Sequence, residues 1–250
     1  MFNYNPNNFG SNYIDVRNNL IIDTQFGDVN GDKFPDIVYL IGNKNQNPFY
    51  ENIKIVIEDG RTKYPYVVPL LPDYDRAYDP WVILTDFVGN RVEDIFISLP
   101  TGGSGGLTEY YIVTFLNNRA AYILTPNWYS TVNNTLGFEV IYKDYYKVEV
   151  VSKKLDKSFI IDVSSRKDFY EGTVYNKVHK LIKPLKGFIL DPTFSYPIKL
   201  NGNEPTTLMV LQDIAGTSHA DSLGTLVTYW SYSQIDLTWK LNASLIGVQI

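Results

Sequence analysis

Short runs rich in Val, Ile, Tyr and Phe recur along the whole chain, and they constrain the fold more than any other feature. Each run is closed by Gly, Asn, Asp or Pro, as in "DIVYLIG", "IKIVIEDG", "WVILTDF", "DIFISLP" and "TTLMVLQDI". β-Branched and aromatic residues favour strands, and the closing residues favour turns. Only "SRKDFYEGTVYNKVHKLIKPLKG" leaves room for a helical turn or two. The sequence therefore predicts an all-β protein.

These runs also repeat at a fixed spacing. "FGDVNGDKFPDIVYLIG" aligns with "LTDFVGNRVEDIFISLP", which places Asp28 over Asp86 at an offset of 58 residues. The same offset leads next to Asp144, between two strand-like runs, and then to Gly202, in a turn. Repeats of about this length with four strands each are typical of β-propeller blades.

We therefore expect residues 1–250 to form a single small β-propeller of four or five four-stranded blades. In the five-bladed alternative, the irregular segment 165–195 and the N-terminal strand-like run complete the fifth blade. A sandwich or barrel with similar hairpins is the alternative, because only the first two repeats match closely.

The first repeat contains a loop, "DVNGDKFPD", that carries oxygen ligands at alternate positions. The ligands expected there are Asp28, Asn30, Asp32, the backbone carbonyl of Phe34, and Asp36. Calcium takes six to eight oxygen ligands, and three carboxylates this close would repel one another without a cation. The pattern predicts a Ca²⁺ site at residues 28–36. The alternative is an acidic turn held by hydrogen bonds without an ion.

The second loop, "DFVGNRVED" at residues 86–94, keeps only part of that set. The expected ligands are Asp86, Asn90 and Asp94, with Val88 where the first loop has an asparagine. Glu93 or a water would have to fill the gap, so we expect weaker Ca²⁺ binding here. The fourth unit offers only "NGNE", which is too poor in carboxylates to predict an ion.

Together these sequence motifs resemble the FG-GAP/VCBS repeats of integrin α-subunit propellers and of many bacterial proteins. "GDVNGDKFPDIVYL", "TDFVGN…DIFISLPTGGSGG" and "IAG…ADSLG" resemble in particular short VCBS-repeat proteins of spore-forming Gram-positive bacteria. The resemblance implies a calcium-stabilised propeller and implies no reaction. Association with the spore or cell surface is a hypothesis that rests on this resemblance.

Three motifs that could carry chemistry are better explained as turns and loops. Ser104 in "GGSGG" fits G-x-S-x-G, but a strand-like run follows it rather than the helix of a nucleophile elbow. His179 and His219 lie 40 residues apart and do not make a metal site by spacing. The acids of "LPDYDRAYDP" lie in a connection bounded by prolines.

The function expected from the sequence is therefore a calcium-binding structural or binding module rather than an enzyme. A lectin-like protein would use Trp81, Trp128 and Trp230 to stack on sugars. A glycan-acting enzyme would need two carboxylates facing each other across the propeller well.

Composition limits the partners and the compartment. The net charge is −5, the pI is about 5.1 and there is no long basic run, so nucleic acid is not an expected partner, whereas a protein or carbohydrate is. The chain has no cysteine, and its start lacks the basic and apolar regions of a signal peptide. No run of about 18 apolar residues predicts a membrane span.

Overall fold

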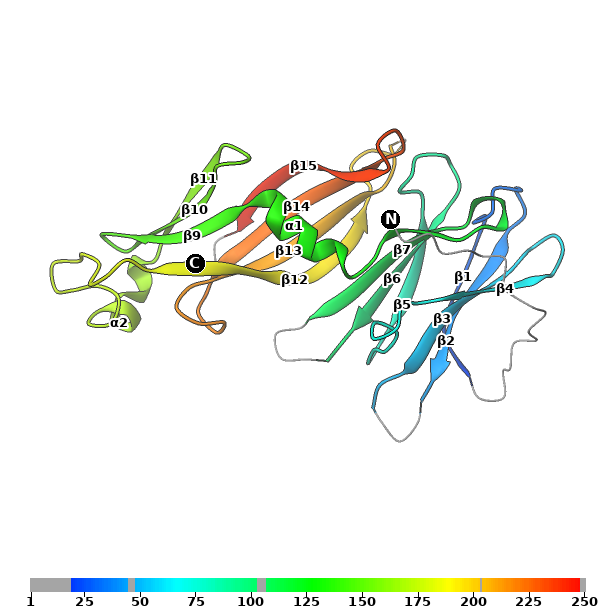
Figure 1. Cartoon of the computed structure of the whole chain (residues 1–250), viewed down its shortest axis with the longest axis horizontal. Coiled ribbons are helices and arrows are strands. Elements are labelled where there is room, and N and C mark those ends of the chain that lie inside the picture. Colours follow the sequence, from blue (N-terminus) through cyan, green and yellow to red (C-terminus); the bar gives the residue numbers. More distant parts are fainter. Residues whose placement is uncertain (1–18, 45–47, 103–106, 203, 248–250) are drawn as a thin grey trace. The chain divides into compact units, whose positions relative to one another are not determined.

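The computed structural model describes residues 19–44, 48–102, 107–202 and 204–247. Fifteen strands account for most of these residues, whereas α-helix is limited to two short segments (Figure 1). The prediction of an all-β protein is confirmed.

The first sheet contains four antiparallel strands in chain order. They are β1 (Leu20–Gly27), β2 (Asp36–Asn43), β3 (Glu51–Glu58) and β4 (Pro65–Pro69). Gly27 pairs with Asp36, so the first acidic loop connects the two strands of the β1–β2 hairpin.

The second sheet repeats this arrangement. Its strands are β5 (Trp81–Thr85), β6 (Asp94–Pro100), β7 (Thr108–Thr114) and β8 (Ala121–Leu124). Thr85 pairs with Asp94, so the second acidic loop has the same place in its hairpin as the first. Strand β6 is buried along nearly its whole length, as its continuous apolar run predicts.

The third sheet contains seven strands in the order β11–β10–β9–β12–β13–β14–β15. Their bounds are β9 (Phe138–Lys143), β10 (Lys147–Ser152), β11 (Lys157–Asp162), β12 (Lys186–Ile198), β13 (Thr207–Ala215), β14 (Ser222–Ser233) and β15 (Thr238–Gly247). Strands β9 to β11 form a meander that joins β12 through Val140 and Ile141 of β9.

Helix α1 (Trp128–Leu136) packs on the seven-stranded sheet (Figure 1). Its buried residues Tyr129, Val132 and Leu136 follow helical spacing and form one face. The Tyr129 hydroxyl lies 2.9 Å from the Ser195 hydroxyl of β12. Gly137, with a positive φ of 58°, ends the helix. The sequence analysis did not predict this helix.

The remaining helical segments are single turns. They are α2 (Lys167–Tyr170) and the 3₁₀ turns Leu116–Asn118 and Ser164–Arg166. Helix α2 lies inside the segment where the sequence allowed a helical turn, so that expectation is confirmed.

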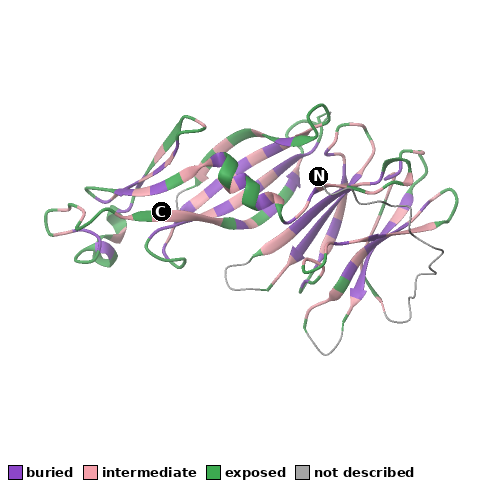
Figure 2. Cartoon of the chain, viewed as in Figure 1, coloured by how far each residue is buried: buried purple, intermediate pink, exposed green. Residues whose placement is uncertain are grey.

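The chain divides into two compact units. The first comprises Met1–Pro126, Tyr196–Leu208 and Ser231–Lys240, and the second comprises Asn127–Ser195, Met209–Trp230 and Leu241–Ile250. The core of the first unit consists of buried aliphatic and aromatic residues from β2, β3, β6 and β7 (Figure 2). Both acidic loops belong to this unit.

The expected four or five four-stranded blades are not what the sheets show. The first two repeats do form two four-stranded sheets, but the third and fourth repeat positions both fall within the seven-stranded sheet. Asp144 lies in the β9–β10 turn, and Gly202 lies in the β12–β13 turn. The spacing of 58 residues was misleading there because it marks turns of one sheet rather than equivalent loops of successive blades.

Candidate functional site

The first acidic loop is folded by hydrogen bonds from backbone amides to its own side chains. The Asp28 carboxylate accepts the N–H of Gly31 at 2.7 Å and that of Lys33 at 2.9 Å. Gly31 and Lys33 have φ values of 85° and 70°, so the backbone turns back on this carboxylate. Asn30 and Asp32 each bond the amide two residues further on, as Asx turns do.

Asp36, the last residue of this loop, is fully buried. Its carboxylate accepts the N–H of Val29 at 3.1 Å and that of Gly60, after β3, at 2.8 Å. Burial raises the pKa of Asp36, while these amides oppose the rise. The side chain therefore ties the loop both to itself and to the β3–β4 turn.

A buried polar network surrounds Asn30. Its amide nitrogen donates to Asp59 at 3.3 Å and to Asn118 at 3.1 Å, and it lies 3.5 Å from Asp36. The amides of Thr62 and Arg61, together with the Asn118 side chain, lower the pKa of Asp59 despite its burial. The network gathers two carboxylates and two carboxamides from three turns of the first unit.

The second acidic loop has the same backbone geometry. The Asp86 carboxylate accepts the N–H of Gly89 at 2.5 Å and that of Arg91 at 2.8 Å, and these residues have φ values of 84° and 66°. Asp94 accepts the amides of Phe87 at 2.8 Å and Val88 at 3.0 Å. The alignment of the two loops by sequence therefore matches residues with the same structural role.

Of the carboxyl groups in the two loops, that of Asp94 has the largest shift in pKa. It is 2% exposed, and burial raises its pKa to about 7, with a smaller contribution from Asp86 and opposition from the amides of Val88 and Phe87. Burial and the nearby Asp28 also raise the pKa of Glu93. The backbone N–H of Glu93 donates to the Asp28 carbonyl at 3.0 Å, and the expectation that its side chain fills the gap left by Val88 stays a prediction.

The metal-binding expectation gains no support from the described residues, and Ca²⁺ at the two loops stays a prediction. Within the part of the chain that the structure describes, no group of three or more His, Cys, Asp or Glu side chains could hold a metal ion. The predicted ligand oxygens of Asp28, Asn30, Asp32 and Asp36 face backbone amides instead. The alternative that the sequence left open, an acidic turn held by hydrogen bonds, accounts for this geometry.

The other candidate residues are dispersed. Ser104 lies outside the described residues. The His179 ring packs 5.2 Å from Tyr146, and the His219 ring packs 5.0 Å from Phe188. The connection 71–80, which holds the acids of "LPDYDRAYDP", is irregular, and its Asp73 and Asp79 are exposed.

The tryptophans proposed as sugar platforms pack against other aromatic residues. Trp230 is 3% exposed, so its ring is not a surface for stacking. Trp128 packs edge-on to Trp230 at 5.1 Å, and Trp81 lies 5.9 Å from Tyr196. Trp81 and Trp128 are half-buried and are the two that retain accessible area.

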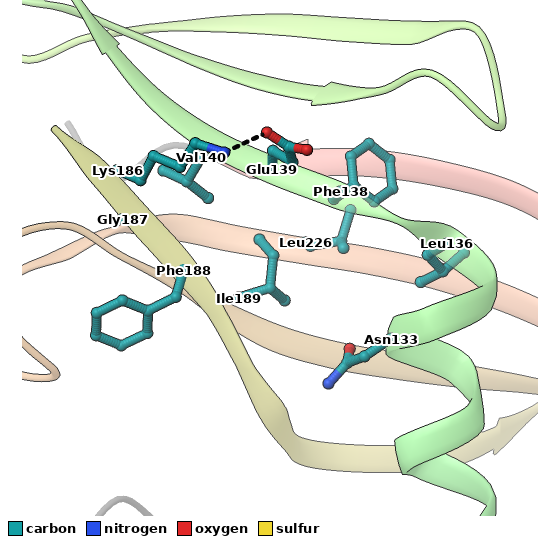
Figure 3. A pocket seen from close by; sticks show the side chains of 10 residues that line it. All are labelled: Asn133, Leu136, Phe138, Glu139, Val140, Lys186, Gly187, Phe188, Ile189 and Leu226. Carbon is teal, nitrogen blue, oxygen red and sulfur yellow. Dashed lines mark hydrogen bonds and ion pairs between the residues drawn. The ribbon is translucent and has the colours of Figure 1, made fainter. Parts of the chain in front are cut away.

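A pocket of about 240 Å³ lies in the second unit, between the end of α1 and strands β9, β12 and β14 (Figure 3). Its apolar lining consists of Leu136, Phe138, Val140, Phe188, Ile189 and Leu226. Its polar groups are Asn133 of α1 and the ion pair between Lys186 and Glu139, 2.8 Å apart. Sequence reasoning missed this pocket, because its walls come from three segments that are distant in sequence: α1 with β9, β12 and β14.

The edges of the pocket are fixed by backbone and amide contacts. A Cβ on Gly187 would lie 2.2 Å from the Ala215 carbonyl, so only glycine allows β12 to approach β13 this closely. Gln212 of β13 is fully buried and donates to the Asn133 side chain at 2.6 Å and to the Leu190 carbonyl at 2.9 Å. These bonds hold α1 over the sheet and keep the pocket open.

A buried carboxylate of the second unit, that of Asp221, is neutralised by protein groups. Asp221 is 2% exposed and accepts the Tyr170 hydroxyl at 2.7 Å, the Arg166 guanidinium at 2.8 Å and the Thr217 amide at 2.7 Å. Burial acts to raise the pKa of Asp221, but these donors and the Arg166 charge outweigh it and lower that pKa. The arrangement is typical of a structural ion pair that joins the loop after β13 to the segment around α2.

Comparison with known proteins decides the family. A family model described as the YybI C-terminal domain matches residues 136–246. The protein named "Uncharacterized protein YybI" from Bacillus subtilis (strain 168) is 32% identical over 226 residues, which cover 90% of this chain and 82% of that relative. The chain belongs to the YybI family.

This finding overturns the resemblance to FG-GAP/VCBS repeats, since it is the YybI family that matches. The similarity had rested mainly on the two acidic loops, with "IAG…ADSLG" as a further motif. A carboxylate-rich turn before an apolar strand also arises where the carboxylates cap backbone amides. The pocket lies almost wholly inside the matched YybI C-terminal domain; of its lining, only Asn133 precedes residue 136. Among the described residues of this YybI-family chain, no helix has the length and apolar character needed to cross a membrane.

Proposed function

We propose that this YybI-family protein is a structural or binding module whose ligand site is the pocket beside α1. The observation that carries the proposal is the pocket itself, with an apolar lining and a few polar groups. Pockets of this composition hold small molecules by burying apolar surface, while the polar groups orient the ligand.

The lining selects the class of ligand. Ile189 and Leu226 lie at the middle of the pocket, with Asn133 on one side and the Lys186–Glu139 pair on the other (Figure 3). A small, flat, mostly apolar molecule would bury its body against the aliphatic side chains. A polar substituent would lie at Asn133 or at the ion pair.

The test uses 8-anilinonaphthalene-1-sulfonate as an apolar probe with one charged group. We expect two-dimensional ¹H–¹⁵N spectra to show saturable shifts at residues 133–140 and 186–189. Ile189→Trp, which fills the pocket from a half-buried position, should weaken binding at least tenfold. Val227→Trp is the matched control, because it adds the same ring to β14 one residue from Leu226, on the other face of that strand.

Equal weakening by both variants, or shifts spread over the whole molecule, would contradict a site at the pocket. No saturable binding of the probe to the unmodified chain would contradict it as well.

Other sequence-based expectations remain open to experiment. Ca²⁺ as a cofactor of the 28–36 loop is tested by melting the protein in EDTA and in millimolar Ca²⁺. A lectin role is tested on a glycan array, with Trp81→Ala and Trp128→Ala as the informative variants, since these two rings keep accessible area. Association with the spore or the cell surface is tested by fractionation.

A further inference from the structure

The charge of this chain is divided along its sequence. Residues 1–126 contain 9 Lys and Arg against 15 Asp and Glu, a net charge of −6, whereas residues 140–186 contain 11 against 6, a net charge of +5. The positive segment includes the connection between β11 and β12.

Much of this positive charge is concentrated in residues 176–183, which we call the basic loop. Lys177, Lys180 and Lys183 are all exposed there. Among the described residues no ion pair involves any of these three lysines, whereas Lys143, Lys147 and Lys186 on the neighbouring strands each pair with a carboxylate. The basic loop therefore presents three lysines that form no ion pair with the described residues, while the Asp144 carboxylate bonds the Leu181 N–H of the loop.

Apolar side chains stand between these lysines. Val178 is 67% exposed and Ile182 is 52% exposed, and Tyr145 in the adjoining β9–β10 turn is 59% exposed. The two segments touch, since the Tyr145 N–H donates to the His179 carbonyl at 2.7 Å. Exposed apolar groups flanked by like charges are typical of a surface that binds a partner of opposite charge.

The basic loop is also held rigidly. The Asn176 side chain accepts the amides of Val178 and Lys180, both at 3.0 Å. The Leu181 N–H donates to the Asp144 carboxylate at 2.9 Å. A loop fixed in this way loses little conformational entropy when it docks.

We propose that the basic loop binds the acidic N-terminal part of a second copy of this chain. The acceptor is the connection 72–79, where Asp73 and Asp79 are exposed and Tyr78 is 40% exposed. This segment carries three aspartates against one exposed cation, Arg76, so its net charge is opposite to that of the basic loop, and its Tyr78 ring complements the aliphatic side chains there. Because the two surfaces differ, each copy can bind one neighbour through each surface, and the association is head-to-tail.

The test is sedimentation velocity of the full chain over a range of concentrations, in 20 mM and in 500 mM NaCl. We expect a sedimentation coefficient that rises with concentration at low salt and stays at the monomer value at high salt, because salt screens exposed charges. Lys180→Glu/Lys183→Glu should weaken association at least tenfold. The matched control is Lys153→Glu/Lys157→Glu, which makes the same charge change in the β10–β11 hairpin, at the turn and at the first residue of β11.

A mixing experiment identifies the acceptor. Asp73→Asn/Asp79→Lys should also remain monomeric alone, while an equimolar mixture with Lys180→Glu/Lys183→Glu should form dimers and stop there. In that mixture one variant keeps an intact acidic connection and the other keeps an intact basic loop, so a single interface can form.

A monomer under all conditions overturns the proposal. So does an acidic variant that assembles normally, or a control that weakens association as much as the basic-loop variant. Anionic phospholipid vesicles are included as a competing partner; binding of the monomeric protein to them through Lys180 and Lys183, without self-association, would assign the basic loop to lipid and overturn the proposal too.

Discussion

The two acidic loops share a backbone but differ in what surrounds them. Asp36 receives amides from its own loop and from Gly60 after β3, whereas Asp94 receives only the amides of Phe87 and Val88. In the first loop Asn30 extends a polar network to Asp59; in the second, Val88 occupies the same position. The comparison shows that loop conformation is set locally, while the energy of the buried carboxylate is set by neighbours that are distant in sequence.

The largest difference between the loops should appear on deletion of the buried carboxylates. Asp36→Ala leaves the amides of buried Val29 and half-buried Gly60 without a partner, at a cost of roughly 1–3 kcal/mol for an amide that water does not reach. Asp94→Ala leaves two amides as well, but it also removes a carboxyl that is costly to ionise. We therefore expect Asp36→Ala to destabilise the fold by at least about 1 kcal/mol more than Asp94→Ala does.

The stability of both variants is measured by urea unfolding, with near-ultraviolet circular dichroism as the signal. Equal losses of stability would mean that the contact with Gly60 contributes nothing and that the two loops are energetically equivalent.

The second-largest difference between the two loops should appear in the pH dependence of stability. The pKa of Asp94 is raised to about 7 in the folded state from an ordinary value of 3.8. Its contribution to stability is fully present below pH 3.8 and is lost as the pH rises through 7, because the folded state binds the proton more tightly. Asp94→Asn has no titrating group at this position. Its free energy of unfolding, relative to that of the unmodified chain, should therefore rise by at least about 1 kcal/mol between pH 5 and pH 8.

The control for this series is a variant at an exposed acid, Asp73→Asn. A stability difference between Asp94→Asn and the unmodified chain that stays constant across the pH range would show that Asp94 titrates normally.

Exchanging the third loop position tests the network itself. Asn30→Val should cost about 1–2 kcal/mol, because Asp59 and Asn118 each lose a buried hydrogen bond. The reciprocal change, Val88→Asn, should be close to neutral, since residue 88 is only half-buried. If both changes have the same effect, Asn30 acts through loop propensity rather than through the network.

Calcium should produce the smallest effect. A site saturated about 100-fold over its dissociation constant would add about 2.7 kcal/mol. Because the Asp28 and Asp36 carboxylates are already bonded to amides, we expect the melting temperatures in EDTA and in millimolar Ca²⁺ to agree closely. A clear shift that Asp32→Ala abolishes and Asn90→Ala does not would restore the first loop as an ion site.

Local features of the fold could be predicted from the sequence. The strands and the equivalence of the two loops follow from the alternation of apolar residues and from turn residues at matched positions. The long-range features could not: Asn30 bonds residues 29 and 88 positions away, and β9 joins β12 by a pairing that no local pattern encodes. The sequence did not indicate helix α1 because its residues, "WYSTVNNTL", mostly have low helix propensity.

The same reason explains why the candidate site is the pocket rather than the expected Ca²⁺ loops. Carboxylates in a tight loop predict either a cation or a set of amide bonds, and only the path of the backbone distinguishes the two. The pocket could not be predicted from the sequence, because residues 136–140, 186–189 and 226 meet only after the sheet has formed.

Helix α1 also has a consequence for dissecting the protein by expression. The match to the YybI C-terminal domain begins at residue 136, the last residue of that helix. A recombinant fragment cut there would lose Trp128 and Tyr129, uncover Trp230 and leave the Ser195 hydroxyl without its bond to Tyr129. It would also lack Asn133 at the pocket wall. A fragment meant to keep the ligand site should therefore start before residue 127, and the shorter one should prove prone to aggregation.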